Sequence, residues 1–208
     1  MAHLLQHALY INLDKRTDRR EHANAEFAKL GISPERFRAR EASHGLLGCA
    51  MSHLKCIEIA RARGWPQVAI FEDDVTFLDP DLLKKQLEKF VANKDRKWDV
   101  IMLAGNNAQP YRLVDDTCIK VTNCFTCTAY IVNGHYYETL FATWSDGMAK
   151  LAQFPDLEHV YALDVTWKAL QRLDHFYLII PLTVIQMSDY SDICKKEVDY
   201  HECMLTIK

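Results

Sequence analysis

The segment Val68-Ala-Ile-Phe-Glu-Asp-Asp74 decides the fold expected for this chain. Its first four residues are all apolar, without the alternation of a half-exposed strand, which predicts a strand buried on both faces in a parallel sheet. Three consecutive carboxylates, which repel one another, follow where this strand leaves the core. Ligands in such sheets bind beyond the carboxyl ends of the strands, so this junction is the first candidate for a functional site.

Helix-like and strand-like patterns alternate on both sides of this segment. The apolar spacing predicts strands over 8–13 and 98–103, helices over 17–31 and 43–64, and a helix that begins at Pro80. Thr17 is the expected N-cap of the first helix. This alternation predicts an α/β domain with a mostly parallel central sheet flanked by helices.

The second half of the chain gives weaker signals. We expect one or two strands over 118–132, helices over 135–144 and 158–173, a strand over 176–180, and an irregular polar tail from Ser188. The length of 208 residues is enough for one domain with a sizeable core. Because no repeat or linker divides the sequence, residues 1–208 are expected to form a single domain.

The composition excludes several classes of protein. Lys and Arg number 25 against 28 Asp and Glu, and the net charge of −3 argues against a protein that coats nucleic acid or anionic membrane. The seven glycines form no G-x-G-x-x-G or G-x-x-x-x-G-K pattern. Any phosphate would therefore be bound without a glycine-rich loop.

The seven irregularly spaced cysteines do not resemble a disulfide framework and are expected to be free thiols in a reducing compartment. The lone Cys124-x-x-Cys127 pair would need further ligands to hold zinc, and His201 and Cys203 are only loose candidates. The first ten residues lack the pattern of a signal peptide, and no apolar stretch reaches the roughly 18 residues that span a membrane. We therefore expect a cytoplasmic protein, with peripheral membrane contact left open.

The carboxylates Glu72, Asp73 and Asp74 suit a metal site. In an extended chain Glu72 and Asp74 point to one side and Asp73 to the other. Two carboxylates on one side suit a hard divalent cation, Mn²⁺ or Mg²⁺, which can bridge a diphosphate and neutralise a leaving phosphate. Solvated or helix-capping carboxylates are the alternative interpretation.

Four blocks of sequence carry a resemblance to a known family. They are, in order, Ile11-Asn-Leu-Asp-Lys-Arg16, Asp18-Arg-Arg20, Gly48-Cys-Ala-Met-Ser-His53 and Ile70-Phe-Glu-Asp-Asp74. Together they resemble glycosyltransferase family 25, which contains lipooligosaccharide galactosyltransferases and collagen hydroxylysine galactosyltransferase domains. Looser matches continue as far as Ile193, so the resemblance covers most of the chain, and the stretch from Gln186 to Tyr190 departs from the family pattern.

The resemblance implies a GT-A type fold, a nucleotide-sugar donor and inversion at the anomeric carbon. The implied enzyme would use Mn²⁺ (or Mg²⁺) to move galactose or glucose from a uridine diphosphate (UDP) sugar to a hydroxyl of a glycan or protein-linked acceptor, as in lipopolysaccharide biosynthesis. Its partners would be the nucleotide sugar and the glycan acceptor, with no nucleic acid. Two alternatives stay open, namely a non-catalytic domain that binds nucleotide sugars and a nucleotidyltransferase.

The resemblance also implies a set of site residues. The implied metal ligands are Glu72 and Asp74, and the implied donor-binding residues are Asn12, Leu13, Arg16, Arg19, Ser52, His53, Asp73, Gly105 and Asn106. Guanidinium groups bind phosphate bidentately, hydroxyl and imidazole groups can donate to phosphate or ribose, and an amide suits a base or sugar. Each residue also has a structural interpretation, such as a solvated basic face, a turn asparagine, or a serine bonded to its own helix.

An inverting transfer needs a base that takes the proton of the acceptor hydroxyl. Asp164 is the first candidate, from its place in the resembling pattern, and Asp189 and Asp192 in the polar tail are the second choices. The alternative for Asp164 is a carboxylate that stabilises the first turn of a helix, worth about 1 kcal/mol.

Overall fold

Strand β3 (Gln67–Glu72) lies inside an eight-stranded sheet in the computed structural model, which describes residues 3–207. The strand order is β2-β1-β3-β10-β5-β11-β8-β7. The other strands of this sheet are β1 (Ala8–Asn12), β2 (Glu35–Arg38), β5 (Val100–Met102), β7 (Tyr111–Leu113), β8 (Cys118–Val121), β10 (Ala129–Asn133) and β11 (Phe176–Ile179). Only β8 and β10 oppose the common direction of this sheet, so the expected mostly parallel α/β architecture is confirmed.

The apolar stretch of β3 is fully buried, with Val68, Ala69, Ile70 and Phe71 all at 0% exposure. It pairs with β1 in parallel and with β10 in antiparallel orientation. Helices cover both faces of the sheet at this position, so neither face of β3 can be polar.

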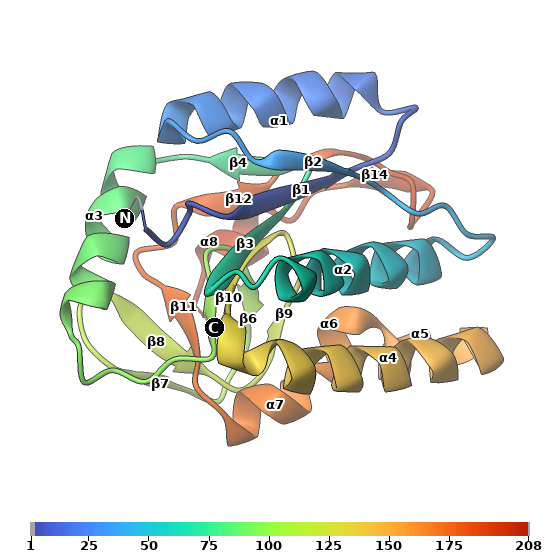
Figure 1. Cartoon of the computed structure of the whole chain (residues 1–208). Coiled ribbons are helices and arrows are strands. Elements are labelled where there is room, and N and C mark those ends of the chain that lie inside the picture. The colour runs from blue at the N-terminus through green and yellow to red at the C-terminus, as the bar shows by residue number, and fades with distance from the viewer. Residues whose placement is uncertain (1–2, 208) are drawn as a thin grey trace.

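Two layers of helices enclose the sheet (Figure 1). On one face α1 (Thr17–Leu30) and α3 (Pro80–Ala92) bury Phe27, Leu87 and their neighbours. On the other face α2 (Gly45–Ala62) and α4 (Tyr137–Gln153) bury Ile57, Trp144 and their neighbours. Helix α1 ends where the sequence predicts, because Gly31 adopts the left-handed φ of 69° that closes a helix. Its N-cap is Arg16 instead of the expected Thr17.

Several segments differ from the expectation. The single helix expected over 158–173 is divided into α5 (Glu158–Tyr161), α6 (Leu163–Thr166) and α7 (Lys168–Leu173). The chain is extended at Ala162, with ψ 150°, and the indole of Trp144 donates a hydrogen bond to the Leu163 carbonyl at 3.2 Å. Tertiary contacts thus override the helical periodicity of this segment.

The polar tail is ordered and not irregular. It contains β13 (Asp189–Ser191), β14 (Lys196–Val198) and α8 (His201–Leu205), and β13 pairs with β14 as a hairpin. The remaining short elements are β4 (Val75–Phe77) paired with β12 (Val184–Gln186), β6 (Asn106–Asn107) paired with β9 (Cys124–Phe125), and the 3-10 helices η1 (Gly134–Tyr136) and η2 (Pro155–Leu157). Pairing of β12 with β4 brings the tail beside the acidic segment that follows β3.

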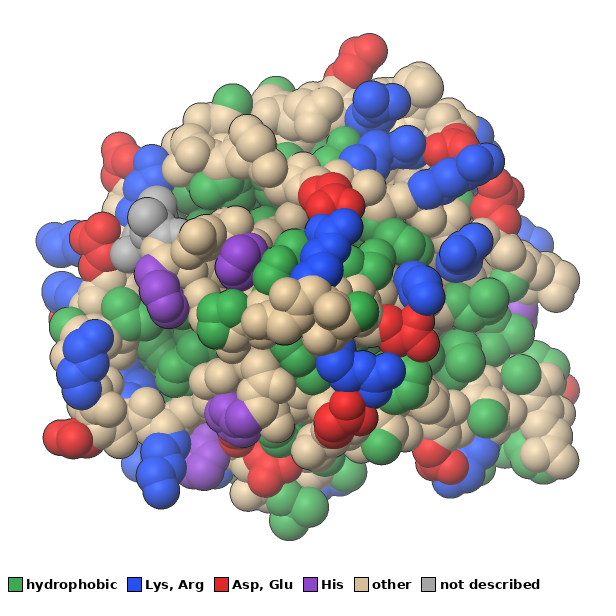
Figure 2. Space-filling model, viewed as in Figure 1, with side chains coloured by type: hydrophobic (Ala, Val, Ile, Leu, Met, Phe, Trp, Pro, Cys, Tyr) green, Lys and Arg blue, Asp and Glu red, His purple; other side chains and the backbone are tan. Residues whose placement is uncertain are grey.

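All seven cysteines are free thiols, as expected. Basic and acidic side chains are interspersed over the face seen in Figure 2. Within residues 3–207, no helix combines the length and the apolar character needed to cross a bilayer.

Candidate functional site

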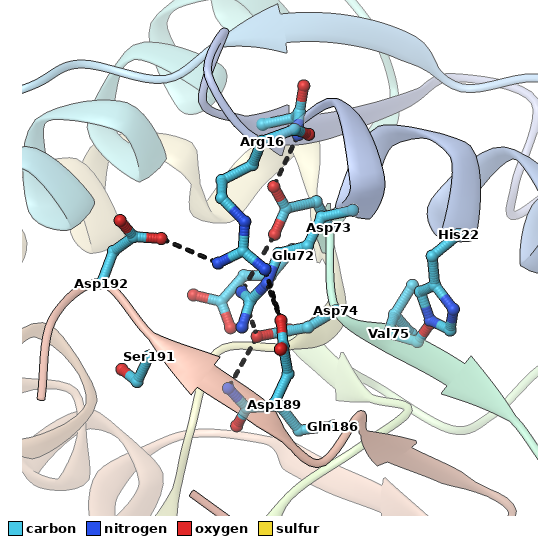
Figure 3. Close-up of polar contacts among 12 residues, drawn as sticks. Arg16, His22, Glu72, Asp73, Asp74, Val75, Gln186, Asp189, Ser191 and Asp192 are labelled. Carbon is cyan, nitrogen blue, oxygen red and sulfur yellow. Dashed lines mark hydrogen bonds and ion pairs between the residues drawn. The ribbon is translucent and has the colours of Figure 1, made fainter. Parts of the chain in front are cut away.

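A cavity of about 200 Å³ lies at the carboxyl ends of β1 and β3. Its walls come from the β1–α1 loop, residues 39–42, the first half of α2, the acidic residues at the end of β3, Gln186, and residues 191–193 of the tail. These segments are distant in sequence and meet where α/β sheets bind ligands. Figure 3 shows the polar side chains that converge there.

The cavity gathers most of the residues expected to form the site. Those that line it are Leu13, Arg16, Arg19, Ser52, His53, Glu72, Asp73 and Asp74. Among the expected residues, Asn12, Gly105, Asn106 and Asp164 are absent from its walls.

The three carboxylates do not alternate as an extended chain would. The strand ends at Glu72, and Asp73 and Asp74 form a turn that leads into β4. As a result, Asp73 Oδ1 and Asp74 Oδ2 both accept from Nη1 of Arg19, at 3.3 and 2.9 Å. The expected division, with Asp73 alone on the other side, is therefore wrong.

The side chain of Asn12 stabilises the acidic turn, which is formed by Glu72, Asp73 and Asp74. Its Nδ2 donates to Asp73 Oδ2 at 2.7 Å and to the Arg16 carbonyl at 3.0 Å, and its Oδ1 accepts from Nε of Arg36 at 2.9 Å. The side chain is 1% exposed, so these protein groups satisfy it. Asn12 therefore orients Asp73 and the start of α1.

Asp74 is the most unusual carboxylate in the cavity. It is 3% exposed, and its Oδ2 accepts from Arg19 and from Nε2 of Gln186 at 2.8 Å. Its Oδ1 is buried without a hydrogen-bond partner. Burial and the nearby charges of Glu72 and Asp73 outweigh Arg19 and raise the pKa of Asp74 to about 7. The unpartnered oxygen could accept a proton or bind a cation.

Arg16 connects the β1–α1 loop to the tail. Its Nη1 donates to Asp192 Oδ2 at 2.9 Å, and its Nη2 contacts Asp189 (Figure 3). Nη1 also donates to the Tyr190 carbonyl at 3.2 Å, and Nη2 also contacts Asp18. Arg19 also reaches Asp189, at 3.0 Å from its Nε. Carboxylates of the tail thus occupy the guanidinium groups that the sequence assigns to phosphate.

Glu72 belongs to a different set of contacts. Its Oε1 lies 3.3 Å from His53 Nε2 and 3.9 Å from Cys49 Sγ. The other ring nitrogen of His53 lies 2.7 Å from the hydroxyl of Tyr130. Burial alone would raise the pKa of Glu72, but the hydrogen bond and the charge of His53 hold that pKa below its usual value.

The hydroxyl of Ser52 makes its hydrogen bonds to backbone groups of the protein. It donates to the Gly48 carbonyl at 2.7 Å and accepts from the backbone N–H of Arg40 at 2.8 Å. Gly48 permits this approach, because a Cβ there would lie 2.5 Å from the Arg40 carbonyl oxygen. The hydroxyl fastens residues 40–42 to α2, as the structural interpretation of this serine predicts.

Asp164 lies outside the cavity, in α6. Its carboxylate accepts from the backbone N–H of Thr126 at 3.1 Å. Thr126 has φ 71°, a strained value for a β-branched residue. Burial and the charge of Glu72 raise the pKa of Asp164 despite this hydrogen bond. Asp164 thus belongs to a neighbouring region that Glu72 affects electrostatically.

Gly105 and Asn106 adjoin this second region. Asn106 pairs with Phe125, the residue before Thr126. A Cβ at Gly105 would lie 2.4 Å from Cys124 Sγ, so close packing requires glycine there. The expected residues therefore form two adjacent groups, one around the acidic turn and one around Thr126.

Sequence reasoning missed three residues of the site. Cys49 lies four residues before His53, and this spacing places both side chains on one face of α2. Tyr130 and Gln186 reach the site through pairing of β10 with β3 and of β12 with β4, which no local pattern encodes.

The fold of the chain has a counterpart among solved structures. The fold is similar to that of a solved glycosyltransferase involved in the glycosylation of the major capsid of PBCV-1. That likeness has a TM-score of 0.53 at 10% identity over 82% of this chain and 79% of the other. It shows the fold, which is that of GT-A-like glycosyltransferases.

Residues 38–152 match the model of glycosyltransferase family 25 (LPS biosynthesis protein). The chain therefore belongs to glycosyltransferase family 25, and the resemblance drawn from its sequence is confirmed. It is 30% identical over 132 residues to the rat protein named probable inactive glycosyltransferase 25 family member 3, covering 62% of this chain and 21% of the relative.

The mouse protein named inactive glycosyltransferase 25 family member 3 is 30% identical over 124 residues, which are 58% of this chain and 19% of the relative. The chain thus spans about a fifth of the length of these curated relatives.

Proposed function

We propose that this chain is a glycosyltransferase that moves galactose or glucose from a UDP-sugar to an acceptor hydroxyl with inversion. The acceptor would be a glycan, such as a lipooligosaccharide core in the cytoplasm, or a protein-linked group. Family membership supports the reaction class. The observation that carries the proposal is the unpartnered Oδ1 of Asp74, in a cavity that also receives the guanidinium groups of Arg16 and Arg19.

The residues present fit a hard divalent cation. Asp74 offers a buried oxygen that no protein group satisfies, and Glu72 offers a second carboxylate on the same cavity. Oxygen ligands of this kind suit Mn²⁺ or Mg²⁺. Such a cation would neutralise the charge that develops on the leaving diphosphate.

The two guanidinium groups would bind the diphosphate of the donor. Arg16 and Arg19 already contact carboxylate oxygens of Asp192 and Asp189, which carry negative charge as phosphate oxygens do. Donor phosphates would replace Asp189 and Asp192 at these arginines, and the tail would move aside. Asp73, fixed by Asn12 and Arg19, would keep Arg19 in place during this exchange.

Asp164 is our proposed base. Burial raises its pKa, which makes its carboxylate a stronger proton acceptor. Burial would also raise the pKa of Asp189 and Asp192, but hydrogen bonds from Arg16 and its neighbours lower both pKa values and weaken these carboxylates as bases. Asp164 would take the proton of the acceptor hydroxyl as the glycosidic bond to the donor breaks.

One observation favours the non-catalytic alternative. Every charged group of the acidic turn has an intramolecular partner, since Arg19 contacts both Asp73 and Asp74, and His53 contacts Glu72. Two curated relatives are also named inactive. A domain that binds nucleotide sugars without turnover would share the same cavity.

Turnover on a panel of nucleotide sugars with and without Mn²⁺ tests the proposal. We expect Mn²⁺-dependent release of nucleoside diphosphate that Asp74→Ala abolishes and that Asp81→Ala, at an exposed carboxylate on α3, leaves unchanged. Equal activity of wild type and Asp74→Ala would show that Asp74 is not a metal ligand. Calorimetric binding of UDP without turnover would support the non-catalytic alternative, and release of pyrophosphate would indicate a nucleotidyltransferase.

A further inference from the structure

Three potential metal ligands of different chemistry meet on one wall of the cavity. They are Cys49 and His53 from α2 and Glu72 from β3. Their ligand atoms all lie within 4.8 Å of one another. Among residues 3–207, these three residues form the group of His, Cys, Asp or Glu side chains that lie close enough together to hold one metal ion. The spacing of four residues on a helix aligns the thiol and the imidazole, and β3 supplies the carboxylate from the facing strand.

The separations are close to those of a tetrahedral zinc site. Zn–S bonds of about 2.3 Å and Zn–N and Zn–O bonds of about 2.0–2.2 Å place ligand atoms roughly 3.3–3.6 Å apart. Here His53 Nε2 lies 3.3 Å and Cys49 Sγ lies 3.9 Å from Glu72 Oε1. Small side-chain rotations would complete the geometry.

A partner for the second ring nitrogen of the histidine is also in place. The Nδ1 of His53 lies 2.7 Å from the hydroxyl of Tyr130, and both side chains are fully buried. Histidines that bind metals usually donate their other ring N–H to an oxygen acceptor, which fixes the tautomer and the ring orientation, and the Tyr130 hydroxyl can serve as such an acceptor. Here Nδ1 would carry the proton, and Nε2 would present its lone pair.

We propose that Cys49, His53 and Glu72 form a zinc site with its fourth position open to the cavity. A set of one thiolate, one imidazole and one carboxylate suits Zn²⁺ better than Mn²⁺ or Mg²⁺, which prefer oxygen ligands alone. All three residues line the cavity, so water or a ligand group can take the fourth position. Binding would displace the thiol proton of Cys49 to solvent.

The zinc site is distinct from the proposed hard-cation site but shares Glu72 with it. Because one carboxylate would serve both ions, zinc at Cys49 would withdraw Glu72 from any cation at Asp74. The binding claim itself does not depend on turnover, so it is tested without a nucleotide sugar.

The test titrates the metal-free protein with Zn²⁺, and separately with Co²⁺ as a spectroscopic substitute. We expect one ion per chain and a thiolate-to-cobalt absorption band that Cys49→Ser removes. His53→Gln and Glu72→Gln should weaken Zn²⁺ binding further than Tyr130→Phe does, and Tyr130→Phe should weaken it about 10- to 100-fold, as for outer partners of metal ligands.

Two controls separate this site from others. Cys194→Ser removes an exposed thiol and should leave the band intact, and Asp74→Asn should keep zinc binding while removing the proposed hard-cation ligand. Circular dichroism establishes that each variant is folded. A wild-type protein that binds no stoichiometric zinc, or a band lost in Cys194→Ser and kept in Cys49→Ser, would overturn the proposal and leave a hydrogen-bonded cluster in its place.

Discussion

The acidic turn after β3 faces two different environments. Toward α1, Asp73 and Asp74 contact Arg19, which also contacts Asp189 of the tail. Toward α2, Glu72 contacts an imidazole and a thiol, with no arginine or lysine among its hydrogen-bond partners in the described chain. Three adjacent carboxylates are thus stabilised in two ways, by the guanidinium of Arg19 on one side and by the imidazole of His53 and the thiol of Cys49 on the other. The α1 side should respond strongly to charge removal, and the α2 side to loss of individual hydrogen bonds.

The largest effect is expected from Arg19→Ala. Removal of this buried guanidinium leaves Asp73 and Asp74 without their shared cation, which costs about 3–5 kcal/mol for a broken buried ion pair. For a chain of this length, each kcal/mol lowers the melting temperature by about 2–4 °C, so calorimetry measures the loss directly. Arg20→Ala, at the exposed neighbour on α1, is the matched control and should change the melting temperature little. Equal losses in the two variants would mean that Arg19 does not stabilise the turn.

Asp74→Asn should stabilise the protein, and only at high pH. The folded protein holds the Asp74 proton up to a pKa of about 7, whereas the unfolded chain releases it near pH 4. The free energy of unfolding therefore falls as pH rises from about 4 through 7. The amide carries no charge, so the variant should gain about 1–3 kcal/mol over wild type at pH 8 and little at pH 5. Melting temperatures across this range measure the difference, and a gain that is independent of pH would contradict the assigned cause.

Ser52→Ala probes the α2 side, where the expected cost is smaller. The substitution leaves the backbone N–H of Arg40 without its acceptor, which costs about 1–3 kcal/mol. No ion pair is involved, so the loss should be the same in low and high salt. Ser43→Ala, at an exposed serine before α2, serves as the control. A salt-dependent loss would show that charge, and not the hydrogen bond, is affected.

The smallest effect on stability is expected at the tail. Asp192 is partly exposed and pairs with Arg16 and with Lys15, so Asp192→Asn should cost no more than about 1 kcal/mol. The same change removes a carboxylate that competes with phosphate for Arg16. We therefore expect UDP to bind a few-fold more tightly, by calorimetry. Asp199→Asn alters a tail carboxylate that contacts Ser188 and not Arg16, and it should leave UDP affinity unchanged.

The size of the cavity supports this role of the tail. Pockets for small molecules usually measure about 300–1,000 Å³, and this one holds about 200 Å³ with residues 191–193 in its wall. A nucleotide sugar would need the tail to withdraw. Unchanged UDP affinity in Asp192→Asn would place the donor elsewhere.

Much of the framework could be predicted because it is encoded locally. The apolar run of β3, the three-and-four spacing of α2 and the terminal Gly31 of α1 each report the structure of their own segment. Two features of the fold could not be predicted from local sequence. The break at Ala162 depends on Trp144, and the tail hairpin is held by arginines more than 170 residues away.

The site was predicted in part for the same reason. Arg16, Arg19 and the acidic turn adjoin strand ends, so their convergence follows from the fold class. The turn at Asp73–Asp74 changes which carboxylates share a partner, and sheet pairing brings Tyr130 to His53; neither follows from spacing along the chain. The spacing of Cys49 and His53 can be recognised in the sequence, but Glu72, the carboxylate that completes the group, comes from strand β3.

The pairing of Arg16 with Asp192 also bears on the order in which the molecule assembles. These residues are 176 positions apart, yet every strand of the large sheet ends by Ile179. Once that sheet has formed, the contact between Arg16 and the tail closes only the short loop from Ile179 to Asp189. The entropy cost of closing the longer loop has then already been met by formation of the sheet. During synthesis the acidic turn therefore meets Arg19 early and the tail late. We therefore expect the tail to dock last during folding and to detach first by local opening. Amide hydrogen exchange at residues 189–198, compared with exchange in β3, would measure the free energy of this opening against that of global unfolding.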